Sequence, residues 1–132
     1  MKVVLDANVI IAAFAARGLC EAVLELCLSD HEIIVSRHLL TEVQRHLVSK
    51  IKLPAEVAKE IVALLEDRGV LVDPASVDQS ACRDRNDLPI LGLAVAADAD
   101  YIVSGDKDLL VLKHHRDIPI CSPRAFADAL RC

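Results

Sequence analysis

Residues 2–6 read Lys2-Val3-Val4-Leu5-Asp6, and this stretch decides the fold. A short, continuous apolar run that stops at an acidic residue is typical of a buried parallel strand. Similar runs follow at residues 33–35, 70–72 and 101–103, and Ile118 with Ile120 indicates a shorter fifth strand. Because helical patterns fill the intervals between these runs, we expect an α/β fold with a parallel sheet and right-handed crossovers.

Helical spacing of apolar residues predicts the segments between the strands. Ser36 is placed to cap one helix, and Pro89 to occupy the first turn of another. The polar, proline-containing residues 73–86 indicate a loop. We expect helices over residues 7–16, 19–28, 37–47, 54–69, 87–97 and 106–112, and a last one from Pro123.

Length and composition support one α/β domain over residues 1–132. The chain is 54% apolar but only 2% aromatic, so aliphatic side chains must build its core. Such a composition suits parallel strands that helices cover on both faces. We therefore expect three layers, with a central five-stranded sheet between helices.

Charge and cysteine content bound the function. A net charge of −5 argues against a surface that grips nucleic acid everywhere, although a local basic rim could still guide a substrate. The five cysteines include no Cys-x-x-Cys pair and are expected to be reduced thiols. No signal peptide or membrane span is recognisable, so a cytoplasmic protein is expected.

Four acidic residues are predicted to meet at one edge of the sheet. Asp6 follows the first strand and Asp106 the fourth, while Asp87 opens the helix before the fourth strand. Glu42 lies about one turn into the helix after the second strand. In folds of this class the site lies outside the carboxyl ends of the strands, where these side chains should converge.

Clustered carboxylates repel each other unless a cation compensates them. Mg²⁺ and Mn²⁺ prefer oxygen ligands, and either ion could activate water for phosphodiester hydrolysis. Each acid alone has an ordinary explanation: Asp6, Asp87 and Asp106 as turn or cap residues, and Glu42 as a solvated helix residue. The hypothesis rests on their joint placement.

The same segments resemble the PIN-domain family across essentially the whole chain. The opening strand with Asp-x-Asn is similar to the start of PIN domains, and three further segments resemble the motifs that carry the family's acids. These four segments are Val3-Val4-Leu5-Asp6-Ala7-Asn8-Val9, Ser36-Arg37-His38-Leu39-Leu40-Thr41-Glu42-Val43, Asp84-Arg85-Asn86-Asp87 and Ser104-Gly105-Asp106-Lys107-Asp108-Leu109-Leu110.

This resemblance implies a PIN fold and a ribonuclease that depends on Mg²⁺ or Mn²⁺. It assigns catalysis and metal binding to Asp6, Glu42, Asp87 and Asp106. It also implies supporting roles for Asn8, Ser104 and Asp108, with Asp84 as a loop residue that could assist Asp87. The chain looks most like VapC-type toxins, which implies a small antitoxin partner and a homodimer.

Several basic residues sit next to the acidic or polar residues of these motifs in sequence: Arg37, Arg83, Arg85 and Lys107. They could form a rim that binds RNA phosphates, or they could only balance the acidic charge. His38 and His46 lie four residues on either side of Glu42, so either could contact it.

Three other functions are compatible with an aspartate after a first strand or with this fold class. A phosphatase of the haloacid-dehalogenase type needs a second aspartate where this chain has Asn8. A nucleotide-binding domain would carry a glycine-rich loop after the first strand, which is missing. A catalytically weak PIN-like module that binds a protein or nucleic acid is the alternative that stays open, as does a role in RNA processing rather than as a toxin.

Overall fold

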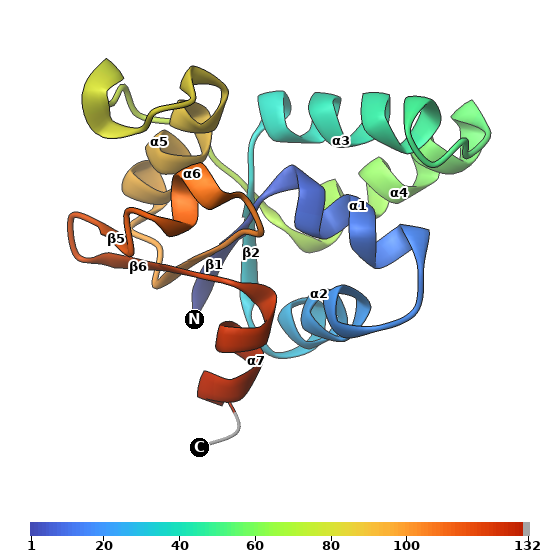
Figure 1. Cartoon of the computed structure of the whole chain (residues 1–132). Helices are drawn as coiled ribbons and strands as arrows, with labels where there is room; N and C mark the ends of the chain where they lie inside the picture. The colour runs from blue at the N-terminus through green and yellow to red at the C-terminus, as the bar shows by residue number, and fades with distance from the viewer. Residues whose placement is uncertain (131–132) are drawn as a thin grey trace.

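The structure is a computed structural model that describes residues 1–130, and its strands form one six-stranded sheet (Figure 1). Their order across the sheet is β3-β2-β1-β4-β6-β5. The strands are β1 (Lys2–Leu5), β2 (Glu32–Val35), β3 (Val70–Leu71), β4 (Tyr101–Val103), β5 (His114–His115) and β6 (Ile118–Cys121).

Five of these strands are parallel, as the sequence predicts, and the expected α/β architecture is confirmed. The strand count is corrected from five to six, because β5 pairs antiparallel with β6 in a hairpin at the sheet edge. This strand has only two residues, both histidines, so it carries neither the apolar run nor the alternation that marks a strand in sequence.

The helices fall close to their predicted positions. They are α1 (Ala7–Ala15), α2 (Leu19–Asp30), α3 (Arg37–Ser49), α4 (Ala55–Arg68), α5 (Leu88–Ala97), α6 (Lys107–Leu110) and α7 (Pro123–Leu130). Ser36 caps α3 as predicted, since its hydroxyl oxygen accepts a hydrogen bond of 3.0 Å from the Leu39 amide.

The predicted loop at residues 73–86 contains two short 3-10 helices, η1 (Gln79–Ala81) and η2 (Arg85–Asp87). Asp87 therefore ends η2 and occupies the N-cap position of α5, with no side-chain capping hydrogen bond, instead of being the first residue of α5. The loop packs tightly on α5, where the Ala75 amide donates to the Gly92 carbonyl at 3.0 Å. A side chain at Gly92 would collide with the backbone of Ala75, so this close approach requires glycine.

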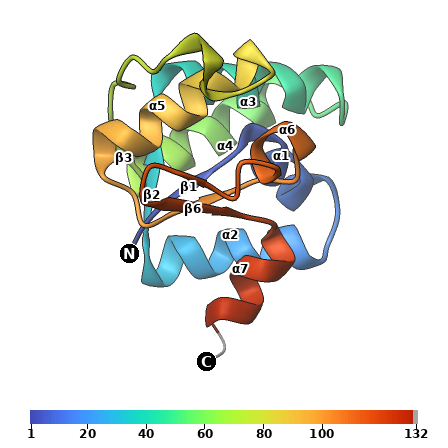
Figure 2. The same cartoon turned by 60° about the vertical axis from the view of Figure 1, so that its left-hand side comes forward.

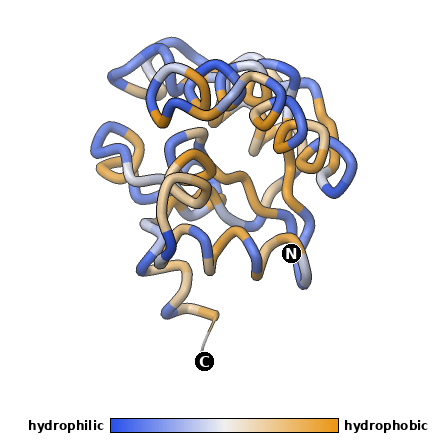
Figure 3. Tube along the Cα trace, turned by 90° about the vertical axis from the view of Figure 1, so that its right-hand side faces the viewer, coloured by the Kyte–Doolittle hydropathy of each residue, from blue (hydrophilic) through white to orange (hydrophobic). Residues whose placement is uncertain are grey.

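Helices cover both sides of the sheet. Figure 2 shows α5 on one side of β1 and β6, with α2 and α7 on the other. Helix α4 packs against α3, β2 and β3. Hydrophobic residues run through the interior of the trace, whereas hydrophilic residues recur on its outer turns (Figure 3). Among the described residues, no helix is both long and apolar enough to cross a membrane.

The register of β1 against β4 positions the acidic edge. Leu5 pairs with Val103 in the ladder, so the next residue of each strand, Asp6 and Ser104, emerges at the same place. The Asp6 amide continues the ladder by donating to the Val103 carbonyl at 2.9 Å. The carboxyl ends of two adjacent parallel strands thus deliver two polar side chains to one point.

Candidate metal centre

Asp6 and Ser104 form the base of the site. The Ser104 hydroxyl donates to Oδ2 of Asp6 at 2.8 Å, and Ser104 is fully buried. Asp6 itself is only 6% exposed. A carboxylate at such a position has lost most of its hydration, and one hydroxyl compensates that loss only in part.

The turn from Ser104 to Lys107 holds the second carboxylate. Ser104 Oγ accepts a hydrogen bond of 3.0 Å from the Asp106 amide, and Asp106 Oδ1 accepts one of 2.8 Å from the Asp108 amide. Asp106 is thereby the N-cap of α6, as its position before a helix suggested. The same serine orients both aspartates.

Asp87 reaches the site from the opposite side, at the junction of η2 and α5. Asp84 caps η2, because its Oδ1 accepts a hydrogen bond of 2.9 Å from the Asn86 amide. The buried thiol of Cys82 lies 3.9 Å from Asp87 Oδ2 and donates to the Asp108 carbonyl at 3.4 Å. Cys82 therefore connects the two segments that carry Asp87 and Asp108, a contact that sequence reasoning missed.

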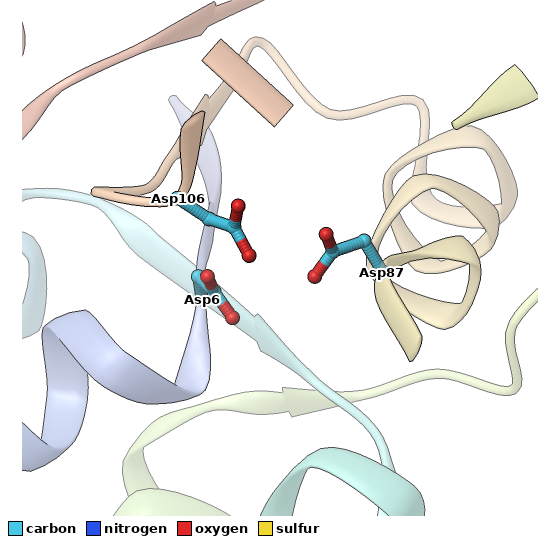
Figure 4. Close-up of side chains that lie close together, drawn as sticks. All are labelled: Asp6, Asp87 and Asp106. Atoms are coloured by element: carbon cyan, nitrogen blue, oxygen red, sulfur yellow. The ribbon is translucent and has the colours of Figure 1, made fainter. Parts of the chain in front are cut away.

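The three aspartates converge on a common space. Carboxylate oxygens of Asp6, Asp87 and Asp106 all lie within 4.8 Å of one another, and Figure 4 shows the three side chains directed toward one another. Asp84, Asp87 and Asp108 form a second set with the same spacing. Asp87 belongs to both sets, so the acidic edge is continuous from β1 to α6.

The pKa values of two of these carboxyls are raised. Burial raises the pKa of Asp6, and the nearby charges of Glu42 and Asp106 add to the rise against the lowering effect of the Ser104 hydroxyl. Burial also raises the pKa of Asp87 to about 7, with further contributions from Asp106 and Asp6. Crowded acids in a poorly hydrated space resist simultaneous ionisation.

Glu42 stands beside the three aspartates rather than among them. It projects from α3, and its Oε2 lies 3.8 Å from Nε2 of His38. Its charge is still close enough to raise the pKa of Asp6. The contact expected between Glu42 and a neighbouring histidine is thus made by His38.

The predicted supporting and basic residues lie around the three aspartates or away from them. Asn8 lies exposed in the first turn of α1. Arg83 and Lys107 line a hollow that also includes Asp108. Arg37 does not join them, because its guanidinium pairs with Glu66 at 2.5 Å.

Arg85 instead lines a pocket with Glu42 and Arg45. Arg45 was missed in the sequence. Its spacing of three residues from Glu42, which places both on one helix face, was the available signal.

The donor set fits a hard divalent cation. Asp6, Asp87 and Asp106 provide only oxygen ligands, and in the described part of the chain none of the three takes part in an ion pair. Buried carboxylates without a cationic partner are costly, and a bound ion such as Mg²⁺ or Mn²⁺ removes that cost.

The fold and the acidic edge together define a class of protein. It is an α/β domain with a cluster of carboxylates, suited to bind a metal ion, at the carboxyl ends of its parallel strands. Comparison with protein families agrees with this class. Residues 2–108 match the model of the PIN domain, which is most of the chain. The chain therefore belongs to the PIN-domain family.

A solved structure has a similar fold. It is the crystal structure of VapBC2 from Rickettsia felis bound to a DNA fragment from their promoter, with a TM-score of 0.64 and 20% sequence identity. The match covers 92% of this chain and 98% of the other. A search of curated proteins found no match.

Proposed function

We propose that this protein is a metal-dependent ribonuclease that hydrolyses RNA phosphodiester bonds with Mg²⁺ or Mn²⁺. The observation that carries the proposal is the convergence of Asp6, Asp87 and Asp106, two of them buried and none ion-paired within residues 1–130. Membership of the PIN-domain family supports the same chemistry.

The three aspartates would hold the ion, with Glu42 at its side. When bound, such an ion lowers the pKa of water and neutralises charge that develops on a phosphate oxygen. Asp84 and Asp108 extend the acidic edge past Asp87 and would assist from there.

The protein's own contribution is to hold these carboxylates in place. Ser104 fixes Asp6 through its hydroxyl and the Asp106 backbone through its oxygen. The Asp108 amide fixes Asp106, and the Cys82 thiol contacts Asp87. Because these supports are made before substrate binds, little reorganisation remains for the reaction itself.

We further propose that the protein is the toxin of a toxin–antitoxin pair. The fold shared with a VapBC2 chain and the presence of all four family acids support this assignment. The proposal implies a small antitoxin that blocks the acidic edge, an RNA substrate in the cytoplasm and a homodimer.

The test is RNA cleavage by purified protein with Mn²⁺ or Mg²⁺, and with chelator. The Asp87→Asn variant is compared with Asp117→Asn, a change of the same type at an exposed position beside β6. We expect metal-dependent cleavage that falls by about 100-fold or more in Asp87→Asn and is unchanged in Asp117→Asn.

Equal cleavage by Asp87→Asn and the wild type would contradict the proposed site. Failure of the wild type to cleave any RNA with either metal would favour the binding-module alternative instead.

A further inference from the structure

A pocket of about 350 Å³ lies beside the acidic centre, between α3 and η2. Its walls include His38, Glu42, Arg45 and His46 from α3, and Arg85 and Asn86 from η2. Two observations show that it adjoins the centre. Asn86 directly precedes Asp87 in the chain, and the pocket is lined by Glu42, whose charge contributes to the raised pKa of Asp6.

The charge of this pocket is opposite to that of the centre. Arg45 and Arg85 contribute two guanidinium groups, and Glu42 is the only carboxylate among the lining residues. Neither arginine pairs with an acid in the part of the chain that the structure describes, and Glu42 has His38 as its neighbour. The pocket therefore carries a net positive charge.

Simple charge balance does not account for the two arginines. An arginine that balances an acid is expected to approach it, as Arg37 approaches Glu66 at 2.5 Å. The Arg45 guanidinium instead lies 3.5 Å from Nε2 of the His46 ring. The guanidinium groups of Arg45 and Arg85 remain available to an anion from solution, and the planar donors of arginine suit phosphate oxygens.

We infer that this pocket binds a backbone phosphate of the RNA, adjacent to the phosphodiester that is cleaved. The inference rests on the proposed ribonuclease function and extends it from the reacting bond to substrate recognition. A cationic pocket next to an acidic centre would offset the repulsion between the RNA backbone and the carboxylates. Such contacts position a strand without reading its bases, which agrees with the near-absence of aromatic residues for stacking.

The test measures the binding of a fluorescein-labelled single-stranded RNA by anisotropy, in chelator, over a series of salt concentrations. Each phosphate contact to single-stranded nucleic acid contributes about 0.7 to the slope of log affinity against log salt. We expect Arg45→Gln and Arg85→Gln each to weaken binding several-fold and to reduce the slope by about 0.7. Arg124→Gln, at an exposed position on α7, is the matched control and should leave the slope unchanged.

Cleavage with Mn²⁺ gives the second readout. The double variant Arg45→Gln with Arg85→Gln should raise KM for RNA more than it lowers kcat, since the lost contact is made before the reaction as well as during it. Intact cleavage with unchanged slopes and KM in the arginine variants would overturn this inference and leave the ribonuclease proposal standing. A wild type that binds RNA with the expected slopes but never cleaves it would overturn the ribonuclease proposal, with the phosphate pocket retained.

Discussion

The two ends of the parallel strands both carry acidic residues, but in different surroundings. At the amino ends, Asp30, Glu32, Asp98 and Asp100 line a hollow of about 670 Å³ and all four are exposed. At the carboxyl ends, Asp6 and Asp87 are 6% and 7% exposed. The amino edge thus has the wide hollow and the exposed acids, while the carboxyl edge has the buried ones.

The difference suggests a criterion for the proposed site: it has buried acids without a cationic partner among the described residues, whereas the other edge has only more numerous exposed acids and a larger hollow. Water screens the exposed acids of the amino edge, and the Lys2 amide donates to Asp100 Oδ2 at 2.8 Å. The buried acids of the carboxyl edge have raised pKa values, with burial as the largest cause. A bound cation would therefore stabilise the buried acids of the carboxyl edge much more than the exposed acids of the amino edge.

The largest expected difference between the two edges is in RNA cleavage. Asp6→Asn should abolish cleavage while the protein stays folded, because the amide keeps the shape of the side chain but loses its charge. Asp100→Asn should cleave as the wild type does. The rates are compared with Mn²⁺ at saturating RNA, after circular dichroism has shown that both variants are folded. Wild-type cleavage by Asp6→Asn would mean that the site lies elsewhere.

The next difference concerns pH and stability in chelator. The pKa of Asp87 is about 7 in the folded chain, against an ordinary value of 3.8. Between these values the folded state holds a proton that the unfolded state has released, so stability falls as pH rises from about 4 to 7. By pH 8 we expect a loss of about 1–3 kcal/mol in the free energy of unfolding, part of which Asp87→Asn should remove.

Urea unfolding at pH 5 and pH 8 measures this effect. The stability of Asp87→Asn minus that of the wild type should be larger at pH 8 than at pH 5. Asp100→Asn should have the same pH dependence as the wild type. Added Mn²⁺ should restore wild-type stability at pH 8, since the ion compensates the ionised cluster. Parallel pH dependence in the wild type and Asp87→Asn would refute the assignment of this effect to Asp87.

The smallest expected difference is in the hydrogen bonds at each edge. Ser104→Ala leaves Asp6 Oδ2 and the Asp106 amide without their partner. We expect it to lower the free energy of unfolding by about 1 kcal/mol at pH 7 and to slow cleavage by about tenfold. Asp100→Ala removes an exposed bond and should change stability by about 0.5 kcal/mol or less. Thermal and urea unfolding of both variants test this contrast. Equal losses of stability in Ser104→Ala and Asp100→Ala would contradict it.

Most of the fold could be predicted from the sequence, because its signals are local. The apolar run before Asp6 and the Ser104-Gly105-Asp106 turn place two acids at strand ends, and parallel pairing then brings those ends together. The strand β5 could not be predicted, since two histidines in a hairpin carry no periodic signal. The boundary at Asp87 shifted because a 3-10 turn before a helix looks like the helix itself in sequence.

The acidic residues were easier to predict than the basic ones. Asp6 and Asp106 follow strand ends, whose position the topology dictates. The direction of an arginine on a helix depends on which partner it meets in the fold. Arg37 lies within a motif but pairs with Glu66 on α4, and Arg45, outside every motif, lines the pocket beside Glu42. Cys82 had no sequence signal at all, because its contacts with Asp87 and Asp108 join separate segments.

The most direct test of the central claim is calorimetric titration of the protein with Mn²⁺ at pH 7. Wild type and Asp100→Asn should bind the ion with similar affinity, and Asp87→Asn should bind at least tenfold more weakly. That result would show that the buried carboxyl edge, and not the exposed amino edge, is the metal centre. Binding of equal strength in wild type and Asp87→Asn, or stronger loss in Asp100→Asn, would contradict the account.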